Sequence, residues 1–143
     1  MDDNGNVCLT DFGMAKIVKD GELAQTFCGT PEYLAPEVLE GKGYNKSADW
    51  WSLGILTYEM MFGLPPFYHN SQKEMFKRIK EGEFRFSDKV KISDEAKDFI
   101  VKMLRKDPAE RLGAKGESSE ILSHPWFADL DKEKMMRKEV IFM

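Results

Sequence analysis

One segment of this sequence, Ala48–Phe62, is apolar on nearly every side when it is drawn as a helix. Ser47 stands where an amino-terminal cap would lie, and Gly63 and Pro65 end the pattern. A helix with apolar side chains all around must be covered all around. The sequence therefore predicts a central buried helix that the rest of the chain surrounds.

The same region raises the question of a membrane span, since Trp50–Phe67 is about as long as one. It contains Ser52, Thr57 and Glu59 and closes with two prolines, which favours a buried helix of a globular domain. The chain has 143 residues, 42% of them hydrophobic, and a formal net charge of −4 without a block of like charge. These values indicate one globular domain, and we expect neither a membrane nor a nucleic acid as its partner.

The two cysteines, Cys8 and Cys28, form no CxxC pair, and no paired histidines complete a zinc-binding set. No secretory signal precedes them. The sequence therefore predicts a reducing, intracellular location, and within the cell the cytoplasm.

Three more helices are predicted by hydrophobic spacing and by capping residues. Ser71 and Glu74 have the form of a capping box before the first, and Ser93 caps the second. The predicted ranges are 72–81, Asp94–Lys106 and about 118–123.

The segment before the central helix is less regular. Asp3-Asn4-Gly5 predicts a type I′ turn, with Val7–Leu9 as the strand that follows it. Residues 13–43 are rich in Gly, Pro and Thr and predict an extended, ordered loop. The expected fold class is therefore mainly α, with a short β-hairpin remnant at the start.

Several motifs follow one another at fixed spacing. They are DFG at 11–13, GTPEYLAPE at 29–37, DWWSLG at 49–54, GLPPF at 63–67, DPAERLG at 107–113 and HPWF at 124–127. In order and spacing they resemble the second half of a protein serine/threonine kinase domain, and TFCGTPEYLAPE is similar to the AGC group of these kinases. The resemblance implies the carboxy-terminal lobe of the kinase-like α+β fold, with a partial kinase domain over 1–128 and a truncated tail over 129–143.

The resemblance implies ATP and Mg²⁺ as cofactors, with Asp11 as the metal ligand and Phe12 and Gly13 beside it. The alternative for Asp11 is a residue that starts the turn before Gly13. The sequence contains no glycine-rich nucleotide loop, no strand lysine and no catalytic loop with its base, so no catalytic residue is assigned. We expect a fragment that is inactive alone, binds neither cofactor alone, and leaves one flank of the central helix open.

A substrate-binding and regulatory surface is also implied by the resemblance. Thr26 corresponds to the activation-loop threonine that an upstream kinase phosphorylates; alternatively, it is an ordinary solvated threonine. Glu32 and Glu59 correspond to acidic positions that receive arginines of a protein substrate with basic residues near the acceptor. As the one charge in an apolar helix interior, Glu59 could instead form a structural ion pair. The positions that correspond to the apolar substrate pocket are Phe27, Pro31 and Leu34, and Thr30 corresponds to a contact of the catalytic base.

Three further positions are implied to be structural. Glu37 and Arg111 correspond to a buried ion pair that ties the end of the loop to the helical lobe. Asp49 corresponds to a carboxylate that holds the catalytic-loop backbone, although an anion in a first helical turn also serves the helix dipole.

Three functional interpretations remain open from the sequence. The chain is part of an AGC-type kinase that phosphorylates Ser/Thr near basic residues, or a kinase-derived module that binds substrates or partners without chemistry. The third interpretation is a product of an incomplete gene model.

Overall fold

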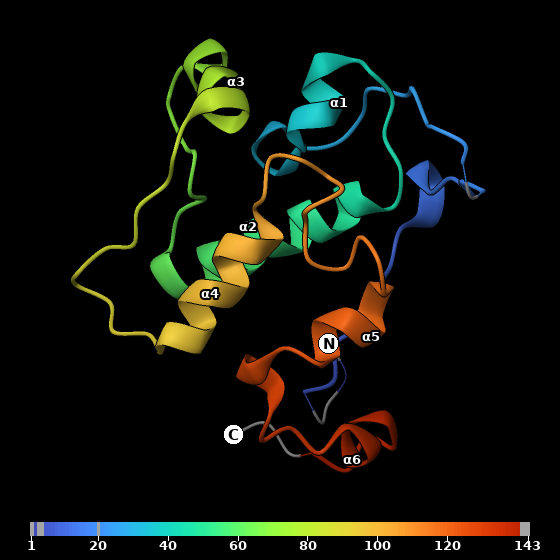
Figure 1. Ribbon diagram of the computed structural model, residues 1–143, viewed down its shortest axis with the longest axis vertical. Helices are drawn as coiled ribbons and strands as arrows, with labels where there is room; N and C mark the ends of the chain where they lie inside the picture. The colour runs from blue at the N-terminus through green and yellow to red at the C-terminus, as the bar shows by residue number, and fades with distance from the viewer. Residues whose placement is uncertain (1, 3–4, 20, 141–143) are drawn as a thin grey trace.

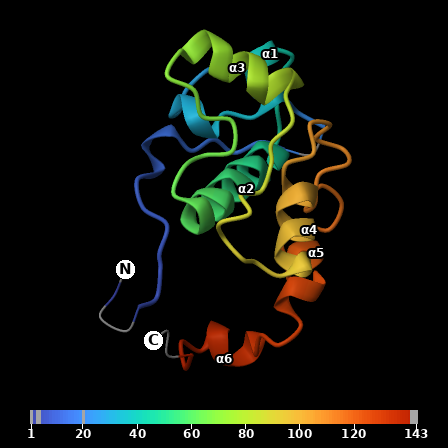
Figure 2. The ribbon, with the colours of Figure 1, turned by 90° about the vertical axis from the view of Figure 1, so that its left-hand side faces the viewer.

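The structure, a computed structural model, describes residues 2, 5–19 and 21–140. This part of the chain is mostly helical, which confirms the predicted class (Figures 1 and 2). Its β-pairing consists of one antiparallel bridge, between Ala24 and Tyr44. The α-helices are α1 (Pro36–Glu40), α2 (Ser47–Phe62), α3 (Gln72–Glu81), α4 (Asp94–Met103), α5 (Glu117–Leu122) and α6 (Lys132–Met136), and the 3-10 turns are η1 (Phe12–Met14), η2 (Pro31–Tyr33) and η3 (Pro125–Phe127).

Helix α2 forms the centre of the fold. Its side chains Trp51, Ile55 and Tyr58 are buried, and α4 packs against it with its own buried stripe. Both views place α1 and α3 together at one end of the molecule and α6 at the other (Figures 1 and 2). The predicted central helix is therefore confirmed.

One flank of α2 is not covered within the described part of the chain. Leu56 is 41% exposed and Met60 is 71% exposed, and they lie on the same side because they are four residues apart. The prediction that α2 is buried on every side is therefore wrong. The prediction that one flank of this helix is open is confirmed.

The predicted caps have different outcomes. The Ser93 hydroxyl accepts the Ala96 N–H at 3.2 Å, as expected. Ser47 lies inside α2 instead of capping it, because its N–H donates to Asn45 Oδ1 and its hydroxyl donates to the Pro108 carbonyl. The predicted cap at Ser47 is therefore wrong, since a tertiary acceptor takes up the hydroxyl.

The capping box of α3 is also wrong. The Ser71 side chain makes no capping hydrogen bond. In a capping box the Glu74 side chain would accept the Ser71 N–H, but this N–H donates to His69 Nδ1 at 3.0 Å. The predicted boundaries of α3 nevertheless hold. Helix α4 is shorter than predicted and ends at Met103, before the turn that leads into Pro108.

The strand expected over Val7–Leu9 does not form in the described residues, and both Val7 and Leu9 are exposed. A strand needs a partner for its ladder of hydrogen bonds, and no described segment provides one here. Of the predicted turn, Asp3 and Asn4 lie outside the described residues, while Gly5 has a φ of 83°. The extended loop over residues 13–43 is interrupted by η2 and α1.

No helix in the described ranges is both long and apolar enough to cross a membrane. The thiols of Cys8 and Cys28 are both free.

The close approach of α2 and α4 depends on Gly54. A Cβ at this position would lie 2.8 Å from Met103 Cβ and 2.9 Å from Leu104 Cδ2. We expect Gly54→Ala to lower the free energy of unfolding by up to about 2 kcal/mol, because overpacking costs about 1–3 kcal/mol and the gain in helix propensity offsets about 1. Urea unfolding measures the change. Leu56→Ala, on the exposed flank of the same helix, is the control with a smaller expected loss, and a more stable Gly54→Ala variant would contradict the packing argument.

Candidate functional site

The end of the long loop is fixed to α2 by polar contacts around Tyr33. The Tyr33 hydroxyl donates to Glu59 Oε2, and the Ser52 hydroxyl donates to the Tyr33 carbonyl at 3.0 Å. Pro31 occupies the first position of η2, where its fixed φ and missing N–H are tolerated. We call Pro31–Tyr33 together with Glu59 the loop-end platform.

The platform carries negative charge. The hydrogen bond to Glu59, burial, and the charges of Glu59 and Glu32 raise the pKa of Tyr33 to about 12. Both carboxylates are partly buried, and neither forms an ion pair with a lysine or arginine of the described ranges. The alternative of a structural ion pair at Glu59 is therefore not realised here, and the platform can accept a cationic side chain from outside.

Tyr33 was missed by the sequence reasoning. A tyrosine next to Glu32 carries no signal of its own, since its partner Glu59 is 26 residues away. The sequence signal that could have indicated Tyr33 is Glu59, the one charge in the apolar interior of α2, because a buried carboxylate needs a hydrogen-bond donor nearby.

The apolar positions predicted to bind substrate differ in environment. Leu34 is buried in the core, Pro31 is partly buried, and Phe27 is 62% exposed. The exposed Thr30 makes no side-chain cap to η2. Their role in substrate binding stays a prediction.

Thr26 lies on the exposed part of the loop, and its carbonyl accepts the Tyr44 hydroxyl at 2.9 Å. Together with the Ala24–Tyr44 bridge, this bond holds the base of the loop against the segment before α2. The Thr26 side chain is therefore presented to solvent from an anchored backbone.

Asp11 lies at the start of η1. Its φ of 61° is left-handed, its Oδ1 accepts the Gly13 N–H at 3.4 Å, and the Phe12 ring is largely exposed. No group of three or more His, Cys, Asp or Glu side chains in the described ranges could hold a metal ion. Mg²⁺ in phosphate-transfer sites is held by one or two carboxylates together with substrate phosphates and waters, so Asp11 by itself supplies only part of such a site.

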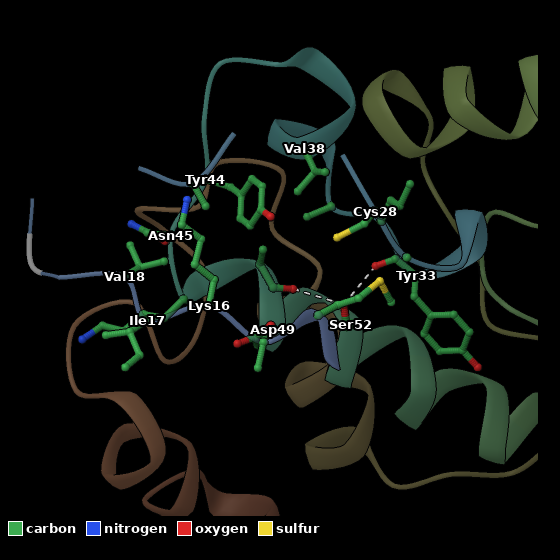
Figure 3. A pocket seen from close by; sticks show the side chains of 18 residues that line it. Lys16, Ile17, Val18, Cys28, Tyr33, Val38, Tyr44, Asn45, Asp49 and Ser52 are labelled. Carbon is green, nitrogen blue, oxygen red and sulfur yellow. Dashed lines mark hydrogen bonds between the residues drawn. The ribbon is translucent and has the colours of Figure 1, made fainter. Parts of the chain in front are cut away.

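A cavity of about 570 Å³ lies between the loop at residues 14–18 and the start of α2 (Figure 3). Asp49 and Ser52 line it from α2, Cys28 lines it from the loop over residues 13–43, and Tyr44 lines it from the segment before α2. Burial raises the pKa of the Asp49 carboxyl. The Asp49 side chain makes no hydrogen bond within the described part of the chain, and its role in holding the catalytic-loop backbone stays a prediction.

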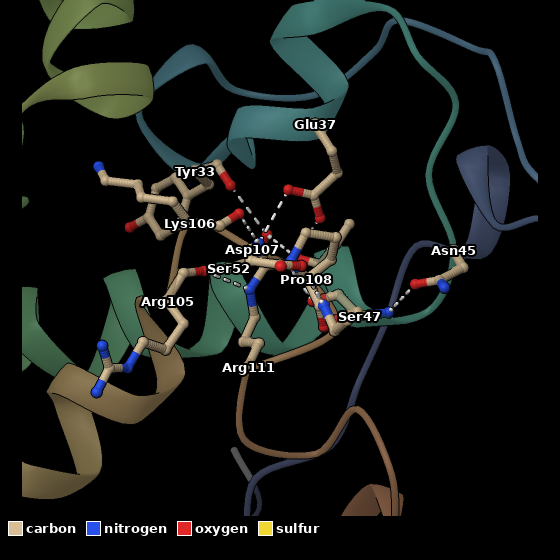
Figure 4. Close-up of polar contacts among 12 residues, drawn as sticks. Tyr33, Glu37, Asn45, Ser47, Ser52, Arg105, Lys106, Asp107, Pro108 and Arg111 are labelled. Atoms are coloured by element: carbon tan, nitrogen blue, oxygen red, sulfur yellow. Dashed lines mark hydrogen bonds and ion pairs between the residues drawn. The ribbon is translucent and has the colours of Figure 1, made fainter.

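Glu37 and Arg111 lie together in the interior (Figure 4). Arg111 donates from Nη1 to Glu37 Oε1 at 2.7 Å and from Nη2 to Oε2 at 2.9 Å. Its other hydrogen bonds go to the carbonyls of Ser47, Arg105 and Lys106 and to the Ser47 hydroxyl. The arginine side chain is 0% exposed. This paired geometry links the end of the loop, α2 and the segment after α4.

Comparison with known proteins gives the following matches. The family described as "Protein kinase domain" matches residues 1–127. The chain is 48% identical over 140 residues to "Protein kinase 2" of Dictyostelium discoideum, covering 98% of this chain and 29% of that protein. Against "Serine/threonine-protein kinase YPK2/YKR2" of Saccharomyces cerevisiae the identity is 46%, covering 99% and 20%.

A human protein, "RAC-beta serine/threonine-protein kinase", is 41% identical over 143 residues, covering 99% of this chain and 29% of the human protein. The chain thus spans less than a third of the length of each of these relatives.

Proposed function

Because this chain belongs to the protein kinase family, we propose that it is the helical, substrate-facing part of a serine/threonine kinase of the AGC type, which transfers phosphate from ATP to Ser/Thr near basic residues. The observation that carries the proposal is the pair of carboxylates whose charges act on Tyr33, namely Glu59, which accepts the Tyr33 hydroxyl, and Glu32, its neighbour in the sequence. Neither forms an ion pair within the described ranges, so both are available to a basic substrate.

Tyr33 supports this function by fixing Glu59. A carboxylate already held by one hydrogen bond loses less conformational freedom when a guanidinium binds its remaining lone pairs. The partly buried position also strengthens the attraction, because solvent screens the pair less than it would on an open surface. The platform therefore suits arginine in particular, whose planar fork matches a carboxylate.

The chemistry of transfer needs more than this platform. ATP supplies the phosphoryl group in this family and Mg²⁺ neutralises its charge. Asp11 alone does not form a site for them, so we propose that the 143 residues by themselves recognise a peptide and do not transfer phosphate.

We propose in addition that an upstream kinase phosphorylates Thr26. Its side chain is exposed on a loop whose backbone is anchored through Tyr44. A phosphate there would add about −1.5 to −2 charges and could order the loop by pairing with cationic side chains.

Specificity tests the proposed function. The chain is fused behind the amino-terminal part of a relative's kinase domain, and phosphorylation of peptides with and without arginine before the acceptor is compared. We expect a preference for arginine, and we expect Glu59→Ala to weaken it by about 2–5 kcal/mol of transition-state binding, since one partly buried charge pair is lost. Tyr33→Phe should weaken it less, because Glu59 remains.

The matched control is Glu83→Ala, which removes an exposed carboxylate outside the platform. An unchanged peptide preference in the Glu59→Ala fusion would assign Glu59 to structure. A fusion that binds basic peptides yet transfers no phosphate would support the binding-module interpretation.

A further inference from the structure

The connection between α3 and α4 contains an extended stretch with two different sides. Residues 82–87 form no helix or turn, and the connection makes up the left-hand edge of the molecule in Figure 1. Phe84 and Phe86 are partly buried, whereas the alternate residues Arg85 and Ser87 are exposed. This alternation is that of an extended chain, in which residues two apart lie on the same side. The Arg85 and Ser87 side chains therefore face solvent together.

The inner side of this stretch is fixed to α2. The Phe84 ring lies edge-on to the Tyr58 ring with the centroids 5.7 Å apart, and the Phe86 ring lies 5.8 Å from that of Phe62. The Tyr58 hydroxyl donates to the Arg85 carbonyl at 2.7 Å. The outward side chains are thus presented from a backbone that one hydrogen bond and two aromatic rings hold in place.

The Ser87 hydroxyl is available to a reagent from outside. Its oxygen accepts the Lys89 N–H at 3.3 Å, and within the described residues the hydroxyl proton has no acceptor. An exposed hydroxyl that donates no hydrogen bond can give its proton to a base of another molecule without breaking a contact of its own fold.

Unpaired charges lie close to this hydroxyl along the chain. Arg85, Lys89 and Lys91 are exposed and form no ion pair in the described ranges, and the same holds for Asp88. With these three basic residues and one acidic residue, segment 85–91 has a net charge of +2. A phosphate on a serine adds about −1.5 to −2 charges, which this segment would balance.

The sequence around Ser87 differs from that of every other hydroxyl residue in the chain. Ser87 alone among the serines and threonines has an arginine within the three residues before it. Ser47, Ser93 and Ser118 have a lysine in that range. Ser47 is buried, and the Ser93 hydroxyl caps α4. An arginine can pair with a carboxylate of a kinase through two parallel hydrogen bonds, which a lysine cannot form.

We propose that Ser87 is a phosphorylation site for serine/threonine kinases that select arginine before the acceptor, here called arginine-directed kinases. The Ser87 oxygen attacks the γ-phosphorus of ATP bound to such a kinase, and an O–P bond forms. The bond from this phosphorus to the oxygen that bridges to the β-phosphate breaks with its electron pair, and ADP leaves. The hydroxyl proton passes to the base of that kinase. The proposal does not depend on the proposed function, because the chain acts here as the substrate.

The phosphate would be held by groups that already surround it. The Lys89 N–H points to the Ser87 oxygen, and a charged phosphate oxygen accepts such a donor more strongly than a hydroxyl does. The Arg85 guanidinium lies on the same side of the extended stretch and matches a phosphate with two parallel N–H groups. We therefore expect phosphorylation to order the turn that follows Ser87.

The experiment incubates the 143-residue chain with Mg²⁺, radiolabelled ATP and a purified arginine-directed kinase whose activity is checked on an arginine-containing peptide. Mass spectrometry maps the phosphate, and a synthetic peptide of residues 80–92 gives the rate for this sequence without the fold. We expect Ser87 to carry most of the phosphate. The folded chain should react at least about one tenth as fast as the peptide, because the side chains that the kinase contacts already face solvent.

Two variants and one residue of the native chain serve as controls. Ser87→Ala should remove most of the incorporation, and Arg85→Ala should lower the Ser87 rate by at least about tenfold, because a charge-assisted contact with the kinase is lost. Ser93, with Lys91 two residues before it in place of an arginine, should be labelled more slowly than Ser87. Circular dichroism checks that the variants fold, and the labelling of the native chain does not depend on them.

A further comparison tests whether the folded chain is the substrate. If only unfolded molecules reacted, the chain would be slower than the peptide by about 10³-fold or more, the usual ratio of folded to unfolded molecules in a small domain. The rate would then also rise in the less stable Gly54→Ala variant. Either result, or labelling mainly at another residue, would overturn the proposal.

Hydrogen exchange of the Lys89 amide, followed by NMR, gives the second measurement. The amide should exchange more slowly in the phosphorylated chain than in the unmodified chain, because its acceptor becomes a charged oxygen. In the Arg85→Ala variant phosphorylated to the same extent, the protection should be smaller. Unchanged exchange after phosphorylation of the native chain would overturn the expected ordering of the turn.

Discussion

Replacing Arg111 by methionine is expected to lower the free energy of unfolding by about 3–5 kcal/mol, because it leaves the Glu37 carboxylate buried without its partner. Glu37 is 8% exposed and both its oxygens accept from Arg111. The carbonyl of Ser47 loses a donor as well. Urea unfolding followed by circular dichroism measures the change, and an unaltered slope with urea would show that the unfolded state is unaffected.

The double variant Glu37→Leu with Arg111→Met separates two explanations. If the loss comes from an isolated buried charge, removing the carboxylate as well should restore much of the stability, since an apolar pair of similar volume is often neutral in such a site. Recovery should be incomplete because the backbone carbonyls that Arg111 served stay unpaired. If Arg111→Met alone lowered the free energy of unfolding by less than about 1 kcal/mol, a stabilising role for the Glu37–Arg111 ion pair would be refuted.

The second large effect is an absence of phosphate transfer by the 143 residues alone. Placement of the reacting groups is worth about 7–11 kcal/mol of the barrier, and each 1.36 kcal/mol changes the rate about tenfold. Of the metal and phosphate ligands that the resemblance implies, the chain contributes Asp11, which is exposed and, within the described residues, has the Gly13 N–H as the hydrogen-bond donor to its carboxylate. The rate should therefore lie below detection.

Radiolabelled transfer to an arginine-containing peptide measures this rate, with Asp11→Ala as the matched control. The two proteins should give the same background, and isothermal titration with Mg²⁺ and ATP should detect no binding by either. Incorporation by the native chain above that of Asp11→Ala would mean that these residues assemble a working site, contrary to the prediction.

The helices could be predicted from the sequence because their signals are local. The stripe of α4 and its cap at Ser93 lie within a few residues of each other, and both were correct. Ser47 and Ser71 carry the same kind of signal, yet Ser47 finds the Pro108 carbonyl 61 residues away and the Ser71 N–H finds His69. Whether a serine caps a helix depends on which hydrogen-bond acceptor or donor lies nearest to it in the folded chain. The local sequence pattern does not determine the distance to partners from other segments.

The site divides in the same way. The acidic positions Glu32 and Glu59 were found through the resemblance, and Glu59 also by its isolation in an apolar helix. The contribution of Tyr33 was not predicted, because it depends on a contact between residues 26 positions apart. Such contacts follow from how helices cross, which hydrophobic periodicity does not determine.

The distance along the chain between Glu37 and Arg111 also bears on how this protein folds as it is synthesised. The two residues are 74 positions apart, and a ribosome adding about 5–20 residues per second makes Arg111 on the order of 4–15 seconds after Glu37. Until then, docking of α1 would bury a carboxylate without a partner, at a cost that favours the open state. We therefore expect the nascent segment of α1 and α2 to stay solvated, with the apolar face of α2 exposed, until Arg111 has been made.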